Sequence, residues 1–61
     1  MYKVTTTTFI NGLKAYQLEQ WVSKKGAWRF CFSTMDAEFF QVYLRKAKIR
    51  SKITEKMEIV E

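Results

Sequence analysis

The sequence predicts an α+β domain: an antiparallel four-stranded sheet with one helix packed on one face, in the chain order β-β-β-α-β. Segments rich in β-branched and aromatic residues are separated by two turn signals, Asn11-Gly12 and Ser23–Gly26. An amphipathic segment with capping residues follows Ser33-Thr34. A chain of 61 residues is enough for one compact domain, so we expect residues 1–61 to form a single unit.

The first two strands are expected at residues 2–10 and 13–22. Asn11-Gly12 is a strong hairpin signal, because a two-residue type I′ turn needs positive φ at both central positions. With that turn, Ile10 lies opposite Leu13 and Tyr2 opposite Trp21. Residues 13–22 contain several good helix formers, so a helix there is the main alternative.

The remaining elements are a third strand at 27–33, a helix at about 35–50 and a fourth strand at 53–60. Ser33 or Thr34 can cap the helix, and the spacing from Ser33 to Asp36 matches a capping box. Acidic residues near the start of the helix and basic residues near its end suit the helix dipole. Ile53, Glu55, Met57 and Ile59 alternate with other residues, as in a strand.

Alternation along the predicted register assigns side chains to the two faces of the sheet. The face that the helix must cover carries eight apolar residues: Tyr2, Val4, Ile10, Leu13, Trp21, Trp28, Phe30 and Phe32. The other face is more polar and basic: Lys3, Thr5, Thr7, Lys14, Tyr16, Gln20 and Arg29, with Phe9, Leu18 and Cys31 among them.

Composition favours a binding protein over an enzyme. The chain has no histidine, and its single cysteine, Cys31, lies between two phenylalanines in a predicted strand, so we expect a structural thiol and no catalytic, metal or cofactor site. Neither a signal peptide nor a membrane-spanning stretch is predicted, and a lone cysteine suits a reducing compartment, so we expect a cytoplasmic protein. The formal charge of +5 favours nucleic acid or an acidic protein surface as the partner.

Nucleic acid is the leading prediction for that partner. Aromatic and cationic side chains together suit single strands, and cations alone suit phosphates. The candidate nucleic-acid-binding residues are Lys3, Lys14, Tyr16, Lys24, Lys25, Arg29, Arg45, Lys48 and Lys52. Three antiparallel strands backed by a helix also resemble AP2-type and integrase arm-type DNA-binding domains, a resemblance that implies a sheet laid against DNA.

The alternative is a small protein-binding inhibitor or adaptor, of the kind that phages use against host machinery. Ala37, Phe40, Tyr43, Leu44 and Ala47 form one apolar arc of the predicted helix, and a second arc runs beside it. A four-stranded sheet wide enough to cover most of both arcs is one possible arrangement. The other follows from the difficulty of turning two arcs of one helix towards one sheet. We therefore expect the second arc to bind a protein partner or a second copy in a homodimer: Met35, Phe39, Val42 and Ile49.

Overall fold

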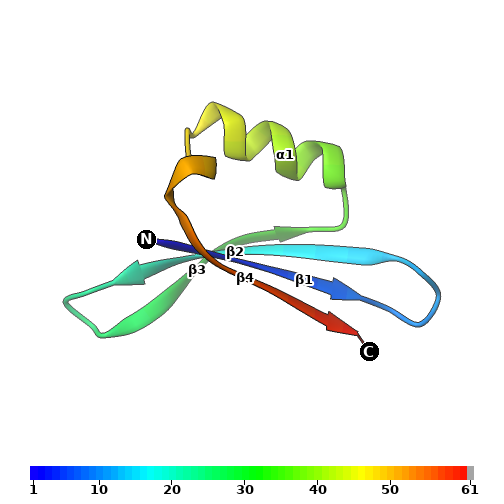
Figure 1. The fold of residues 1–61 in the computed structure, drawn as a ribbon, viewed down its shortest axis with the longest axis horizontal. Coiled ribbons are helices and arrows are strands. Elements are labelled where there is room, and N and C mark those ends of the chain that lie inside the picture. Colours follow the sequence, from blue (N-terminus) through cyan, green and yellow to red (C-terminus); the bar gives the residue numbers. More distant parts are fainter. Residues whose placement is uncertain (61) are drawn as a thin grey trace.

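A single helix covers one face of a four-stranded sheet in the computed structural model, which describes residues 1–60 (Figure 1). The elements in chain order are β1 (Tyr2–Thr8), β2 (Lys14–Val22), β3 (Ala27–Thr34), α1 (Ala37–Lys46), the 3-10 turn η1 (Arg50–Lys52) and β4 (Ile53–Val60). The strand expected at residues 13–22 is confirmed, and no helix forms there.

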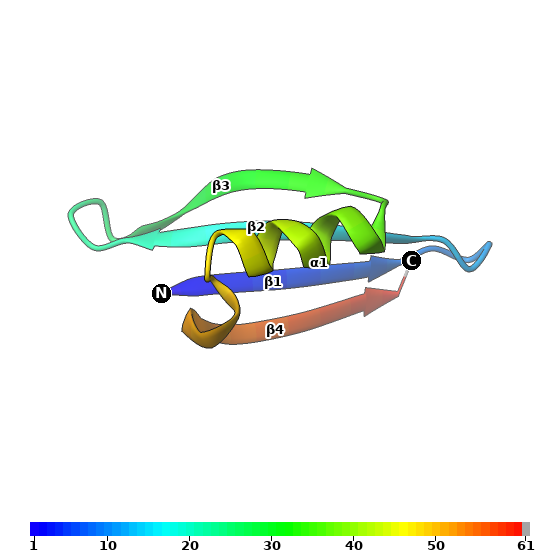
Figure 2. The same cartoon turned by 90° about the horizontal axis from the view of Figure 1, so that it is seen from above.

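The sheet is mixed, with the strand order β3-β2-β1-β4. β2 is antiparallel to β1 and to β3, whereas β4 runs parallel to β1. The expectation of a wholly antiparallel sheet is therefore wrong. The reason is the connection: α1 crosses the sheet from the β3 edge to the β1 edge and returns the chain to its starting end, so β4 must run in the same direction as β3 and β1 (Figure 2).

The β1–β2 hairpin is shifted by one residue from the predicted register. Tyr2 pairs with Gln20 instead of Trp21, and Thr8 pairs with Lys14. The amide of Gly12 donates to the carbonyl of Phe9 at 2.9 Å, and the amide of Phe9 donates to the carbonyl of Leu13 at 2.8 Å. These bonds enclose a three-residue loop in which only Gly12, at φ 87°, is left-handed. Asn11-Gly12 thus forms a longer turn with a glycine bulge, not a type I′ turn.

A second irregularity lies in β3. Leu18 pairs with Phe32 and Glu19 pairs with Phe30, so Cys31 has no partner residue and forms a β-bulge. The bulge leaves Phe32 on the helix side and turns Phe30 to the opposite face. The prediction that one covered face holds all eight apolar residues is wrong for five of them: the bulge displaces Trp28 and Phe30, the hairpin shift displaces Trp21, and Ile10 and Leu13 lie in the exposed loop between β1 and β2.

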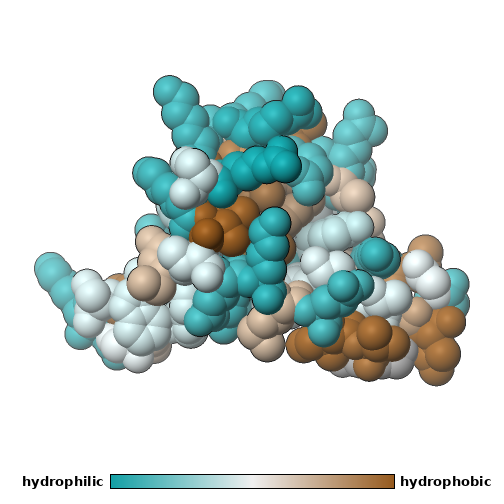
Figure 3. Space-filling view, viewed as in Figure 1, coloured by the Kyte–Doolittle hydropathy of each residue, from teal (hydrophilic) through white to brown (hydrophobic). Residues whose placement is uncertain are grey.

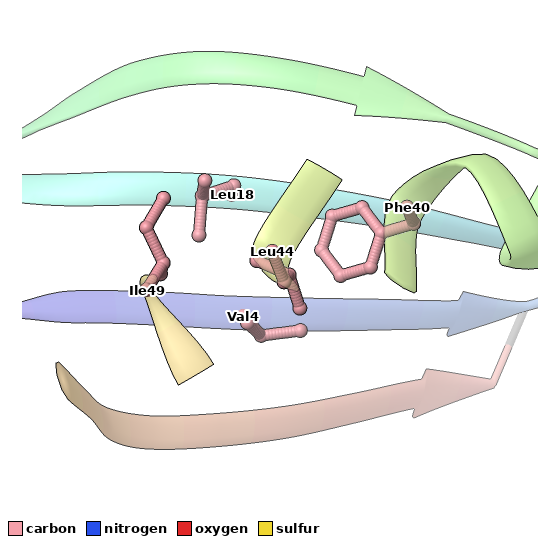
Figure 4. Close-up of a cluster of buried hydrophobic side chains, with 5 residues drawn as sticks. All are labelled: Val4, Leu18, Phe40, Leu44 and Ile49. Carbon is pink, nitrogen blue, oxygen red and sulfur yellow. The ribbon is translucent and has the colours of Figure 1, made fainter. Parts of the chain in front are cut away.

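The core lies between the sheet and α1 and consists of five buried side chains (Figure 4): Val4, Leu18, Phe40, Leu44 and Ile49. Leu18 and Phe40 are 0% and 1% exposed. Leu18 had been expected on the opposite face, and the one-residue shift of the hairpin brings it under the helix.

The helix begins later than predicted. Asp36, not Ser33 or Thr34, is the N-cap, and its Oδ1 accepts from the amide of Phe39 at 3.0 Å. The hydroxyl of Thr34 accepts from the amide of Asp36 at 3.1 Å. Thr34 therefore holds the capping residue in place, and Asp36 satisfies a free amide of the first turn.

The helix also ends earlier, at Lys46 instead of residue 50. Lys48 has a φ of 55°, and its amide donates to the carbonyl of Arg45. The amide of Ile49 donates to the carbonyl of Leu44 at 3.0 Å. This pair of bonds is a Schellman motif, whose usual apolar contact is here supplied by the buried side chains of Leu44 and Ile49.

Candidate functional site

A groove runs between α1 and β4 on the helix side of the sheet. The helix lies over the middle of the sheet, above β2 and β1, and β4 lies to one side of it (Figure 2). The groove has a volume of about 160 Å³. It is the place where the helical layer stops short of the sheet edge.

The groove has an apolar floor and a polar rim. Tyr16 stacks on Phe40 with the ring centroids 5.4 Å apart, and this pair closes one end of the floor. Figure 3 shows an apolar patch between the helix and the sheet, framed by hydrophilic side chains. The polar residues that line the groove are Thr6, Gln41, Arg50 and Lys56.

A cluster of cations lies beside this groove, where the chain passes from α1 through η1 into β4, and we call it the basic end. Two of its members, Arg50 and Lys56, line the groove. The basic end contains six of the eleven lysines and arginines within a stretch of 12 residues: Arg45, Lys46, Lys48, Arg50, Lys52 and Lys56. All six are exposed. The fold gathers them because the helix terminates, turns back through η1 and enters β4 in a short space. The negative end of the helix dipole favours the first of these cations.

The cations of the basic end form no ion pair within the described part of the chain. Within residues 1–60, the two ion pairs are Lys3–Glu19 at 3.7 Å and Lys14–Glu58 at 3.9 Å, and neither involves the basic end. The one carboxylate in this stretch is Glu55. It pairs in register with Lys3 on the opposite face of the sheet.

Three of the predicted nucleic-acid-binding residues belong to the basic end: Arg45, Lys48 and Lys52. The other cations are dispersed. Lys24 and Lys25 lie in the exposed β2–β3 turn, and Arg29 donates to the side-chain oxygen of Gln20 at 3.0 Å. Lys3 lies on the face away from the helix, where its ammonium is 4.6 Å from the centre of the Trp28 ring.

Tyr16, Lys14 and Arg29, which the predicted register places on one face of the sheet, do not form a cluster. Tyr16 pairs with Thr34 whereas Arg29 pairs with Gln20, four residues further along β2. At about 3.3 Å per residue, that separation is roughly 13 Å. The expectation that Tyr16 lies on the outer face is wrong, because its ring is stacked against Phe40 in the edge of the core.

The predicted partner-binding arc is also divided. Ile49 is buried in the core, so its expected exposure is wrong, and Val42 is half-buried. Met35 and Phe39 remain more than half exposed. Phe39 makes an edge contact with Phe32, with centroids 6.1 Å apart, so the second arc partly covers β3.

Sequence reasoning missed Lys46, Arg50 and Lys56, together with the polar groove residues Thr6 and Gln41. The signal was the run of cations at residues 45–52. A helix extended to residue 50 spreads those cations around its circumference, whereas the observed end at Lys46 places them at a corner of the fold. Lys56 joins them only because β4 is parallel to β1.

Neither metal-ligand groups nor membrane-spanning helices are found in residues 1–60. No three side chains of Cys, Asp or Glu there lie close enough to hold a metal ion, and no helix there has the length and apolar character needed to span a bilayer. Cys31, half-buried at the bulge, donates its thiol to the carbonyl of Arg29 at 3.8 Å.

Comparison with known proteins gives no relative. No family model, no curated protein and no solved structure matches the chain.

Proposed function

We propose that this protein binds nucleic acid through the basic end and the adjoining groove between α1 and β4. The observation that carries the proposal is the concentration of six exposed cations, unpaired within residues 1–60, in one short stretch of the chain, two of which, Arg50 and Lys56, line the groove. Phosphates would lie on these cations. Gln41 and Thr6 on the rim supply hydrogen-bonding groups for a sugar or a base edge. The proposed activity is binding and uses no catalytic group.

Charge on the opposite face supports the same choice of surface. That face carries Lys3, Glu19 and Glu55, a net charge of −1, and Lys3 is paired with Glu19. A sheet laid against DNA would bring phosphates to these two carboxylates. The helix side is therefore the better phosphate-binding surface.

The test is fluorescence anisotropy with labelled single-stranded DNA, duplex DNA and RNA over a range of salt concentrations. If all six cations contact phosphates, the logarithm of the affinity falls with the logarithm of salt with a slope of about −5 on duplex DNA or about −4 on a single strand. Arg50→Glu with Lys56→Glu should weaken binding about 100-fold at 0.1 M salt, because about one decade is lost for each phosphate contact.

The matched control is Lys24→Glu with Lys25→Glu. It changes the net charge by the same amount at exposed positions of the β2–β3 turn, outside the groove. This variant should retain most of the parent's affinity. Equal losses in the two variants, or no binding by the parent at low salt, would contradict the proposal. If polyglutamate binds as tightly as nucleic acid, the partner of the basic end would be an acidic protein surface instead.

The alternative function, a protein-binding inhibitor or adaptor, has weaker support at the helix. Of the four residues predicted to contact a partner, only Met35 and Phe39 are more than half exposed. Two side chains make a small patch, and the ring of Phe39 already packs edge-on against Phe32. The larger exposed apolar surface lies on the other side of the sheet.

A further inference from the structure

The face of the sheet turned away from α1 has no covering layer (Figure 1). We call it the open face. Trp21 and Trp28 form a cross-strand pair on it, and Phe30 follows on β3. Met57 and Ile59 lie on β4 at the opposite edge of this face, where they pair in register with Thr5 and Thr7. The two strands between the edges carry mostly polar and charged residues on this face: Lys3, Thr5, Thr7, Ala15, Gln17 and Glu19.

Large apolar side chains of the open face are in contact with water. Phe30 is 56% exposed, Met57 is 46% exposed and Ile59 is 40% exposed. The two tryptophans are half-buried, and they shield each other in an edge contact with centroids 5.3 Å apart. Large apolar side chains exposed at both edges of a sheet face indicate an interaction site.

Charge on this face limits the choice of partner. The cations of the protein lie mainly on the helix side and in turns, and the open face has a net charge of −1. A polyanion is disfavoured there. A second copy brings the same exposed aromatic and aliphatic side chains and the same small net charge, with its own cations directed mainly outward.

The area of the open face is sufficient for a dimer. Strands of seven to nine residues in a four-stranded sheet present a face of roughly 20 by 25 Å, from a spacing of about 4.8 Å and a rise of about 3.3 Å per residue. Two such faces in contact bury at least roughly 1,000 Å² in total, which reaches the lower range of specific interfaces.

The small size of the core also favours association with a second copy. Five side chains are buried in the described chain, all of them on the helix side of the sheet. Domains of this size gain stability by association when a single core is small. Packing the open face against a copy of itself would give each sheet a second apolar layer.

We propose that two copies associate open face to open face, as a sandwich of helix, sheet, sheet and helix. The two-fold axis passes between the sheets, so the same residues of both copies contribute to the interface. Both basic ends then remain on the outer surfaces. The interface is distinct from the helix arc that the sequence predicted.

Analytical ultracentrifugation without nucleic acid tests the association. The parent should sediment at about twice 7.3 kDa and dissociate on dilution. Phe30→Lys should give a monomer with an unchanged far-UV spectrum. Phe39→Lys is the matched control, because Phe39 is 54% exposed but lies on the helix. That variant should remain a dimer.

A second pair of variants tests the same interface in case Phe30→Lys does not fold. Met57→Lys should dissociate the dimer, whereas Met35→Lys, at a comparably exposed position before the helix, should not. The only two tryptophans of the chain lie on the open face, so their emission should shift to shorter wavelength as the concentration rises. A parent that stays monomeric at all concentrations, or dissociation by the helix variants alone, overturns the proposal. Because no nucleic acid is present, this result is independent of the groove.

Discussion

Lys48 adopts a backbone conformation that is unfavourable for any residue with a Cβ atom. Its φ of 55° lies in the left-handed region, where a Cβ atom costs about 1–2 kcal/mol. Glycine is the usual residue at this position of a Schellman motif. The buried contact between Leu44 and Ile49 holds the turn in place. The lysine thus adds a charge to the basic end at some cost in stability.

Lys48→Gly should therefore stabilise the fold by about 1 kcal/mol, which corresponds to a rise in Tm of about 4–8 °C for a domain of this size. Thermal unfolding followed by circular dichroism measures the change. The control is Lys46→Gly, which removes the same charge from a position with ordinary helical geometry and should lower the Tm. A loss of stability in both variants would show that Lys48 is unstrained.

At the scale of elements, the sequence indicates most of the secondary structure but not its register. β-branched and aromatic composition locates the strands, because it reflects local fit to a pleated surface. The hairpin register depends on whether Asn11-Gly12 closes a loop of two or three residues, and both loops accept this dipeptide. No local sequence pattern around Cys31 predicts the bulge. Each of these irregularities exchanges the two faces of a strand.

Register determines which substitution is costly. Leu18→Ala should destabilise the protein by about 2–5 kcal/mol, because it opens a cavity beside Phe40 and Leu44. Phe30→Ala should cost under about 1 kcal/mol in the monomer, because its side chain is half exposed. Urea denaturation at concentrations where the chain is monomeric measures both. The predicted register requires the reverse order of effects.

The position of the candidate site was predicted less well than the elements. Arg45, Lys48 and Lys52 were identified because cations at a helix end are visible in the sequence. Their grouping with Arg50 and Lys56 was not, because it depends on where the helix stops and on which edge β4 joins. Tyr16 was misplaced for the same reason as Leu18, by the one-residue shift in the hairpin.

For the whole molecule, the two faces of the sheet have different chemistry. The helix side contains the core and most of the cations that form no ion pair within residues 1–60, and the open face combines exposed apolar side chains with a net charge of −1. We propose that one side binds nucleic acid and the other binds a second copy. The two proposals use separate surfaces, so either can fail alone.

Coupling between association and stability is measurable by calorimetry. If the dimer unfolds and dissociates together, the Tm should rise by about 5 °C for each tenfold rise in concentration. Phe30→Lys should abolish this dependence, whereas Phe39→Lys should preserve it. A parent Tm that does not change with concentration would argue against an open-face dimer.

The parallel pairing of β1 with β4 has a consequence for synthesis of the protein on the ribosome. Tyr2 and Ile53 are partners although about 50 residues separate them, so β1 is made early and acquires its second neighbour late. At about 5–20 residues per second, the interval is roughly 3–10 seconds. During this time the hairpin carries an unpaired edge of four consecutive threonines. An open edge of this kind invites pairing with other chains, so the nascent protein is most prone to aggregate just before β4 emerges.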